Sequence, residues 1–141
     1  MSVCIAANLE RGPGESRVAL VPETVKKFTG LGARVKLESG AGRASHFTDA
    51  DYAGAEISAR ITDANVMLCV TPPSPEEIAQ LPEGSILLGL LAPYASKERL
   101  AALNARRITA FALELLPRIS RAQSMDVLSS QASCAGYQCG L

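Results

Sequence analysis

Short apolar runs that alternate with helical patterns constrain the fold of this chain more than any other feature. Five segments have the length of single β-strands and lie at residues 3–7, 34–38, 65–70, 85–88 and 108–112. All but the second are almost continuously apolar, which is typical of strands buried on both faces. Strands separated by helical patterns predict a parallel sheet. Right-handed crossovers then give an open, doubly wound α/β lobe, flavodoxin-like or Rossmann-like, with helices on both faces.

Local signals place the helices between these strands. The strand at 34–38 alternates polar and apolar residues strictly, which predicts one exposed side near an edge of the sheet. Cap residues and apolar spacing predict helices from Pro22 to about Gly32, from Thr48 or Asp49 to Ala53, from Ser74–Pro75 onward, from Lys97 to Asn104, and from about Met125 to Tyr137.

Size and charge narrow the class of protein. The chain has 141 residues, of which 48% are apolar, and its 14 basic residues balance 14 acidic ones. Residues 1–141 are therefore predicted to form a single lobe with a substantial core. Zero net charge argues against a nucleic-acid surface. The longest apolar run, 86–92, is too short to insert into a membrane, and the amino terminus does not resemble a signal peptide.

The cysteines and the single histidine predict no metal site. Cys4 and Cys69 lie in apolar runs and are interpreted as buried small hydrophobes, while Cys134 and Cys139 form a C-x4-C pair. His46 is the only histidine, so a zinc site has too few ligands. The pattern favours a reduced, cytosolic protein.

Two glycine loops resemble the dinucleotide fingerprint only in part. Residues 12–14 and 40–45 both lack its third glycine, and neither leads directly into a helix. We interpret both as ordinary turns, so no complete dinucleotide site is expected in this chain. His46 is interpreted as a surface group, and Glu76 with Glu77 as a solvated helix start.

Polar side chains are concentrated at residues 116–130, after the last strand. Open α/β sheets bind ligands at the carboxyl ends of their strands. Arg118 and Arg121 can hold a phosphate or carboxylate, and Gln123 can match an amide or a ribose hydroxyl. Asp126 can accept from ribose hydroxyls or hold an arginine. The same residues also fit a simple capped helix, with Ser124 as the N-cap and Asp126 in the first turn, and the chemistry alone leaves both interpretations open.

The segment from Arg118 through Asp126 to Tyr137 resembles the signature loop of the NAD(H)-binding component of proton-translocating nicotinamide nucleotide transhydrogenase. The similarity extends through 14–23 and 38–42, which are also shared with alanine dehydrogenases. In that family the loop reaches over the nicotinamide and its ribose. The resemblance thus implies cofactor contacts by Arg118, Gln123, Asp126 and Ser129, with Arg121 as a second-rank contact.

The resemblance also implies the wider assembly. NAD(H) binds here, NADP(H) binds on a partner domain, and a hydride passes directly between them, coupled to proton passage through a membrane domain. Such a transfer requires no catalytic side chain. The expected partners are a glycine-rich NAD-binding second lobe, absent from this chain, the NADP(H) domain, the membrane domain and a second copy in a homodimer. The expected location is cytoplasmic and peripheral to the inner membrane.

Two departures and two alternatives accompany this resemblance. The family's Pro-Lys-Glu after the first strand is replaced by Asn8-Leu9-Glu10, and without the second lobe the isolated chain is expected to be inactive and to bind NADH weakly. An alanine dehydrogenase would place a lysine after the strand ending near Val70 and a histidine after the one ending near Leu88; neither is present. A non-catalytic, truncated α/β binding module is the other alternative.

Overall fold

A six-stranded parallel sheet forms the centre of the lobe in a computed structural model that describes residues 2–140. The strand order is β3-β2-β1-β4-β5-β6, and all five neighbouring pairs are parallel. The strands are β1 Cys4–Ala7, β2 Arg34–Glu38, β3 Ala55–Ser58, β4 Val66–Cys69, β5 Ile86–Gly89 and β6 Thr109–Ala112. The helices are α1 Pro22–Gly30, α2 Pro75–Ala79, α3 Lys97–Ala105 and α4 Val127–Cys139.

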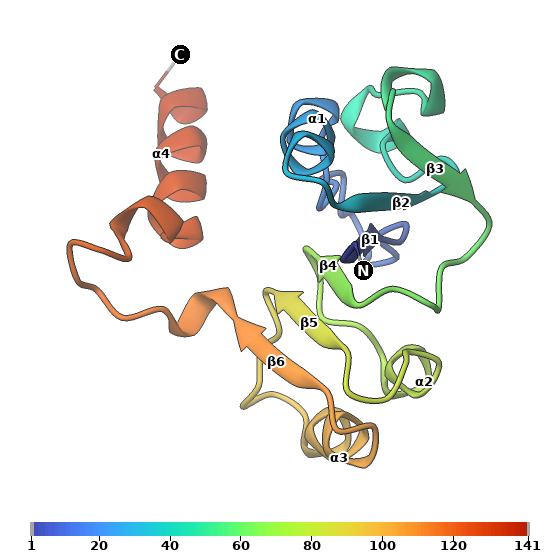
Figure 1. The fold of residues 1–141 in the computed structure, drawn as a ribbon. Coiled ribbons are helices and arrows are strands. Elements are labelled where there is room, and N and C mark those ends of the chain that lie inside the picture. The colour runs from blue at the N-terminus through green and yellow to red at the C-terminus, as the bar shows by residue number, and fades with distance from the viewer. Residues whose placement is uncertain (1, 141) are drawn as a thin grey trace.

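Helices cover both faces, as the sequence predicted. α1 lies on one face over β1 and β2, whereas α2 and α3 lie on the other face beneath β4–β6 (Figure 1). Each face has its own core cluster. Leu20, Val25 and Leu37 belong to the cluster under α1, and Ile78, Leu87 and Leu103 belong to the one under α2 and α3. All six are at most 5% exposed, so apolar burial on both sides of the sheet is the main stabilising contribution.

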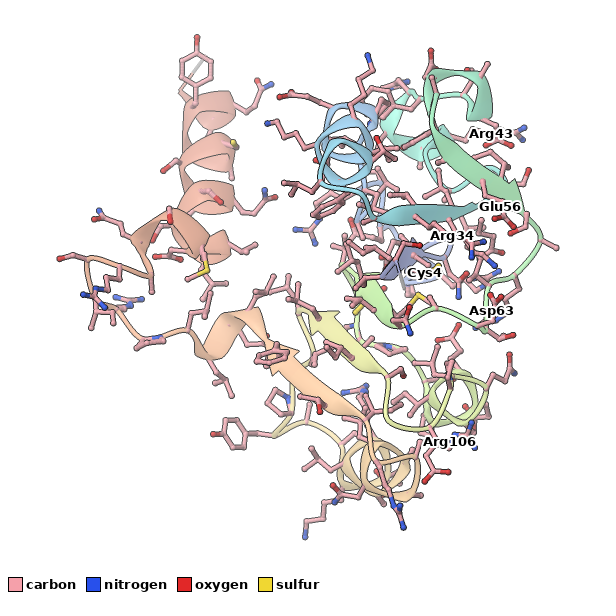
Figure 2. The ribbon with its side chains drawn as sticks, in the orientation of Figure 1. Cys4, Arg34, Arg43, Glu56, Asp63 and Arg106 are labelled. Carbon is pink, nitrogen blue, oxygen red and sulfur yellow. The ribbon has the colours of Figure 1, made fainter. Side chains whose placement is uncertain are left out.

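The structure adds a strand that the sequence analysis missed. β3 is four residues long and pairs with β2 at the sheet edge, with Leu37 opposite Ile57. Its small and polar side chains give only a short alternation between turns, so it carries little periodic signal. The polar and apolar residues of β2 alternate, but the polar side that was predicted to be exposed is exposed only at Arg34, because Lys36 is half-buried and Glu38 is buried. There Arg34 bonds Glu56 at 3.2 Å and Lys36 bonds Asp63 at 2.7 Å (Figure 2).

The helical segments differ from the predicted ones in several places. The helix predicted from Thr48 or Asp49 is a single 3-10 turn, Asp49–Asp51, closed by a capping box from Thr48. A second 3-10 turn, Arg43–Ser45, follows directly on Gly42, where no helix was expected. α4 begins at Val127 with Asp126 as its N-cap, so the prediction of Ser124 as the cap was wrong. Across residues 2–140, no helix combines the length and apolarity that a membrane crossing requires.

Candidate functional site

Loops at the carboxyl ends of the strands gather where the strand order reverses, between β1 and β4. This switch point is the usual ligand position in open α/β sheets. Three acidic side chains lie at the end of a strand or just after it. Each one connects two of these loops by hydrogen bonds that its carboxylate accepts from backbone N–H groups. Glu38 binds the loop after β1, Glu10 binds the loop after β4, and Glu114 binds the loop after β5. Each carboxylate accepts backbone N–H groups that would otherwise lack partners.

Glu10 makes the most complete of these ties. Its carboxylate accepts from the backbone N–H of Val70 at 2.6 Å and of Thr71 at 2.9 Å, and from the Thr71 hydroxyl at 2.6 Å. The loop after β1 is thereby joined to the loop after β4 across the switch point. Glu10 is thus a structural side chain in this lobe, although its place in the sequence gave no sign of that.

Glu38 is a buried carboxylate at the end of β2. It accepts from the Leu9 N–H at 2.8 Å and from the Arg11 guanidinium. Burial by itself raises the pKa of Glu38, but the Arg11 and Leu9 bonds outweigh that cost, so its pKa lies below the ordinary value. The carboxylate is therefore charged at neutral pH and fixes the first turn after β1.

A cleft of about 360 Å³ lies on the α1 side of the sheet, next to α4. We call it the α4 cleft. Its floor is apolar and half-buried, with Leu68 from β4, Leu88 from β5 and Leu90 after β5. Arg17 and Gln131 stand at its rim, and Val127 at the start of α4 completes one wall. An apolar floor with few polar groups around it is the usual form of a small-molecule site.

Arg17 connects the loop after β1 to α4. Its guanidinium is held by both oxygens of Glu15, at 2.8 and 2.7 Å, and donates to the Gln131 side-chain oxygen at 3.3 Å. The Arg17 bonds lower the pKa of Glu15, so the pair is fully charged at neutral pH. Because Glu15 fixes the guanidinium, Arg17 keeps one edge at the cleft while it holds α4.

The predicted residues of the 116–130 segment lie on a surface loop between β6 and α4. Arg118, Arg121 and Gln123 are all exposed, and no residue in the range 2–140 hydrogen-bonds to their side chains. Ala122, between them, is 5% exposed and anchors the loop. None of the five predicted residues lines either large cleft, although Val127 and Gln131 in the following helix line the α4 cleft. The loop therefore presents unpaired polar groups on the surface, between Leu113 and Val127, which both line that cleft.

Asp126 and Ser129 are brought together by the start of α4. The Asp126 carboxylate accepts from the Ser129 N–H at 3.0 Å and from its hydroxyl at 2.6 Å. These bonds, with a smaller contribution from the Arg118 charge, lower the pKa of Asp126. The structure thus places Asp126 as a helix cap, whereas the side chains of Arg118, Arg121 and Gln123 have no hydrogen-bond partner within residues 2–140.

We expect Asp126→Ala to loosen the first turn of α4 and Asp126→Asn to preserve it, because asparagine caps helices as well as aspartate does. Amide exchange of residues 128–131 should rise several-fold in the alanine variant and stay near the wild-type rate in the asparagine variant. Equal exchange in all three proteins would show that the cap does not hold α4.

A larger cleft of about 740 Å³ opens on the opposite face, beside α2. The connection from β3 to β4 crosses there without a helix, and Arg60 and Ile61 of that connection line the space. Cys69 lines both clefts. Burial raises the pKa of its thiol to about 12, so this cysteine is protonated and unreactive at neutral pH. Cys69 belongs with Cys4 to the core on that face, as the sequence predicted.

The structure also shows where the other residues considered in the sequence analysis lie. Gly14 and Gly40 adopt left-handed conformations in turns, with φ of 74° and 77°. His46 is exposed and closes the Arg43–Ser45 turn. Glu77 is more than a solvated helix start, because it completes the Ser74 capping box and binds Arg60 at 2.9 Å. Sequence patterns missed this bond because its partners lie on different elements.

Comparison with known proteins shows which family the chain matches and which proteins are similar to it. Residues 7–135 match the family described as "Alanine dehydrogenase/PNT, N-terminal domain". An NAD(P) transhydrogenase alpha subunit of Rhodospirillum rubrum is 45% identical over 95% of this chain. The crystal structure of a transhydrogenase from Sinorhizobium meliloti superposes on 96% of the chain with a TM-score of 0.91 and 43% identity. Alanine dehydrogenase of Bacillus subtilis is 35% identical over 86% of the chain.

The similarity covers only a fraction of each relative. The chain spans 38% of the Rhodospirillum rubrum subunit, 42% of the Sinorhizobium meliloti structure and 33% of the Bacillus subtilis enzyme. More than half of each of these proteins therefore has no counterpart in the 141 residues.

Proposed function

The chain belongs to the alanine dehydrogenase/PNT N-terminal domain family, and on this premise we propose that it supplies the nicotinamide-facing half of an NAD(H) site in a transhydrogenase. A companion lobe, corresponding to the remainder of the relatives, holds the adenine and the diphosphate. A hydride then passes directly from NADH to NADP+ on another domain, leaving NAD+ and NADPH, and this transfer is coupled to proton passage through a membrane domain. In the cell this lobe stands on the cytoplasmic side and reaches the inner membrane through its partner subunits, as a homodimer.

One observation carries the proposal. Arg118, Arg121 and Gln123 stand exposed on a loop beside a cleft whose floor is apolar. A planar ring fits the half-buried floor of Leu68, Leu88 and Leu90. Gln123 can both donate to and accept from a carboxamide, and the two arginines suit phosphate or ribose oxygens. The residues present therefore fit a nicotinamide nucleotide.

The proposal gives each of these residues a role. The bound nucleotide supplies the hydride, so the protein has to orient and shield it. Arg118 and Gln123 bind the exposed end of the nucleotide. Asp126 and Ser129 fix the end of the loop through the helix cap and offer their outer lone pairs to a ribose hydroxyl. The apolar floor excludes water from one side of the ring. No side chain has to exchange a proton.

Alanine dehydrogenase activity is the second candidate, because relatives with that name match the same lobe. The structure offers it little support. Thr71 follows β4 where that family has its lysine, and its hydroxyl is bonded to Glu10 at 2.6 Å. Leu90 and Leu91 follow β5 without an imidazole. An assay with pyruvate, ammonia and NADH separates the two, since the transhydrogenase proposal predicts no turnover.

We expect the 141-residue chain alone to bind NADH with an affinity weaker than micromolar, because half of the site lies on the companion lobe. Fluorescence titration measures this directly. Reassembly with the companion lobe and the NADP(H) domain should then give hydride transfer between nucleotide analogues. Micromolar binding by the chain alone would contradict the shared site. NADH binding without transfer in the reassembled protein would favour a non-catalytic binding module.

A further inference from the structure

The loop after β5 contains a strained residue at the carboxyl edge of the sheet. Ala92 has a φ of 42°, in the left-handed region that an alanine rarely adopts. Residues in such conformations persist where their surroundings enforce them, and they cluster at functional sites. Leu90, two residues earlier, forms part of the floor of the α4 cleft. The strained residue therefore lies in the same loop as part of the cleft floor.

Two charged side chains hydrogen-bond to the backbone of this loop, one to its N–H groups and the other to its carbonyl oxygens. The Glu114 carboxylate accepts from the Leu91 N–H at 2.9 Å and from the Ala92 N–H. The Arg99 guanidinium donates to the carbonyl oxygens of the same two residues, at 3.1 and 3.4 Å, and to Pro73 at 3.0 Å. Successive N–H groups that point at one carboxylate resemble an anion nest, and the left-handed conformation of Ala92 turns the chain immediately after them.

Glu114 also stands at the origin of the polar loop. It lies in the 3-10 turn Leu113–Leu115, which leads directly into the segment carrying Arg118 and Gln123. Leu113 and Leu90 both line the α4 cleft. One carboxylate thus fixes the floor of the cleft and the point from which the polar loop departs.

We propose that Glu114 is a positioning residue for hydride transfer: its carboxylate holds the strained turn at Ala92 and thereby sets the path of the loop that covers the nicotinamide. The inference rests on the proposed function and adds a residue to it. The nucleotide's affinity comes largely from the companion lobe. Loss of the Glu114 hydrogen bonds therefore misplaces the nicotinamide ring without releasing the nucleotide. Small misplacements of the reacting atoms slow a hydride transfer strongly.

Glu114→Ala tests this in the protein reassembled from this chain, the companion lobe and the NADP(H) domain. Alanine removes the carboxylate oxygen that accepts from both the Leu91 and the Ala92 N–H, so both hydrogen bonds are lost. We expect kcat for hydride transfer to fall about tenfold or more, while KM for NADH stays within about twofold. Adding Ala92→Gly should restore much of kcat, because glycine holds the left-handed turn without strain.

A second variant, Ala92→Val, tests the same inference without changing Glu114. Ala92→Val leaves Glu114 intact but opposes the turn, since β-branched residues resist positive φ, and it should reproduce the loss of kcat. In the 141-residue chain, the Leu91 and Ala92 amides should exchange faster in either variant. Glu83→Ala, at an exposed pair 3.4 Å from Arg107, is the matched control. A wild-type kcat in Glu114→Ala, or a double variant no faster than the single one, would overturn the inference. Absence of transfer in the wild-type reassembly would instead refute the proposed function. The amide exchange of Leu91 and Ala92 would still show whether Glu114 holds the loop.

Discussion

Gly89→Ala is expected to destabilise the lobe by about 3 kcal/mol or more, a large fraction of the roughly 5–15 kcal/mol that stabilises a typical domain. Gly89 ends β5 directly opposite Cys69 of β4. A methyl group there would overlap the Cys69 carbonyl oxygen and stand 2.6 Å from the Cys69 sulfur. Since the carbonyl belongs to a central strand paired on both sides, it cannot move away without breaking the sheet.

Urea denaturation of the 141-residue chain measures this loss. Gly136→Ala is the matched control, because a methyl group there meets nothing within 4 Å and the position lies within α4. The control should be unchanged or more stable by about 0.5–1 kcal/mol. A Gly89→Ala protein within about 1 kcal/mol of the wild type would show that β4 and β5 are not packed as described.

Glu10→Ala is expected to cost about 2–4 kcal/mol, since it removes three hydrogen bonds to a carboxylate and leaves two backbone N–H groups near the switch point without their partner. Glu10→Gln keeps an acceptor oxygen and should cost less. The loss is expected in denaturation midpoints and in faster exchange of the Val70 and Thr71 amides.

The control for Glu10 is Glu83→Ala. Glu83 pairs with Arg107 at the surface, where both side chains are more than half exposed, so its removal should change stability by less than about 0.5 kcal/mol. If Glu10→Ala and Glu83→Ala lost the same small amount, the carboxylate at position 10 would not be tying the two loops together.

Most of the fold could be predicted from hydrophobic periodicity, because strands that are buried on both faces form continuous apolar runs in the sequence. The continuous apolar runs at 65–70 and 85–88 became β4 and β5, and the alternation at 34–38 became β2 with one polar side. β3 was missed because a short edge strand such as Ala55–Ser58 needs few apolar residues. The last helix was expected two residues too early because Ser124 and Asp126 are both good caps, and only the backbone conformation decides between them.

The candidate site was predictable only where its residues are neighbours in sequence. The loop from Arg118 to Ser129 could be found because its polar residues lie close together in the sequence. Contacts between distant residues left no such trace. Arg17 and Gln131 are 114 positions apart, and Glu10 lies about 60 positions from the loop that it ties. The role of Glu114 depends on the shape of a turn more than 20 positions away.

Gln123 offers the most direct test of the central claim. Its side chain is exposed and hydrogen-bonds to no other residue within 2–140, so its removal should leave the fold intact. In the subunit reassembled from this chain, its companion lobe and the NADP(H) domain, hydride transfer by Gln123→Ala should be measured beside thermal stability. The account predicts a loss of about tenfold or more in kcat/KM with an unchanged melting temperature. Wild-type transfer by Gln123→Ala, and also by Gln123→Ala combined with Asp126→Asn, would contradict it.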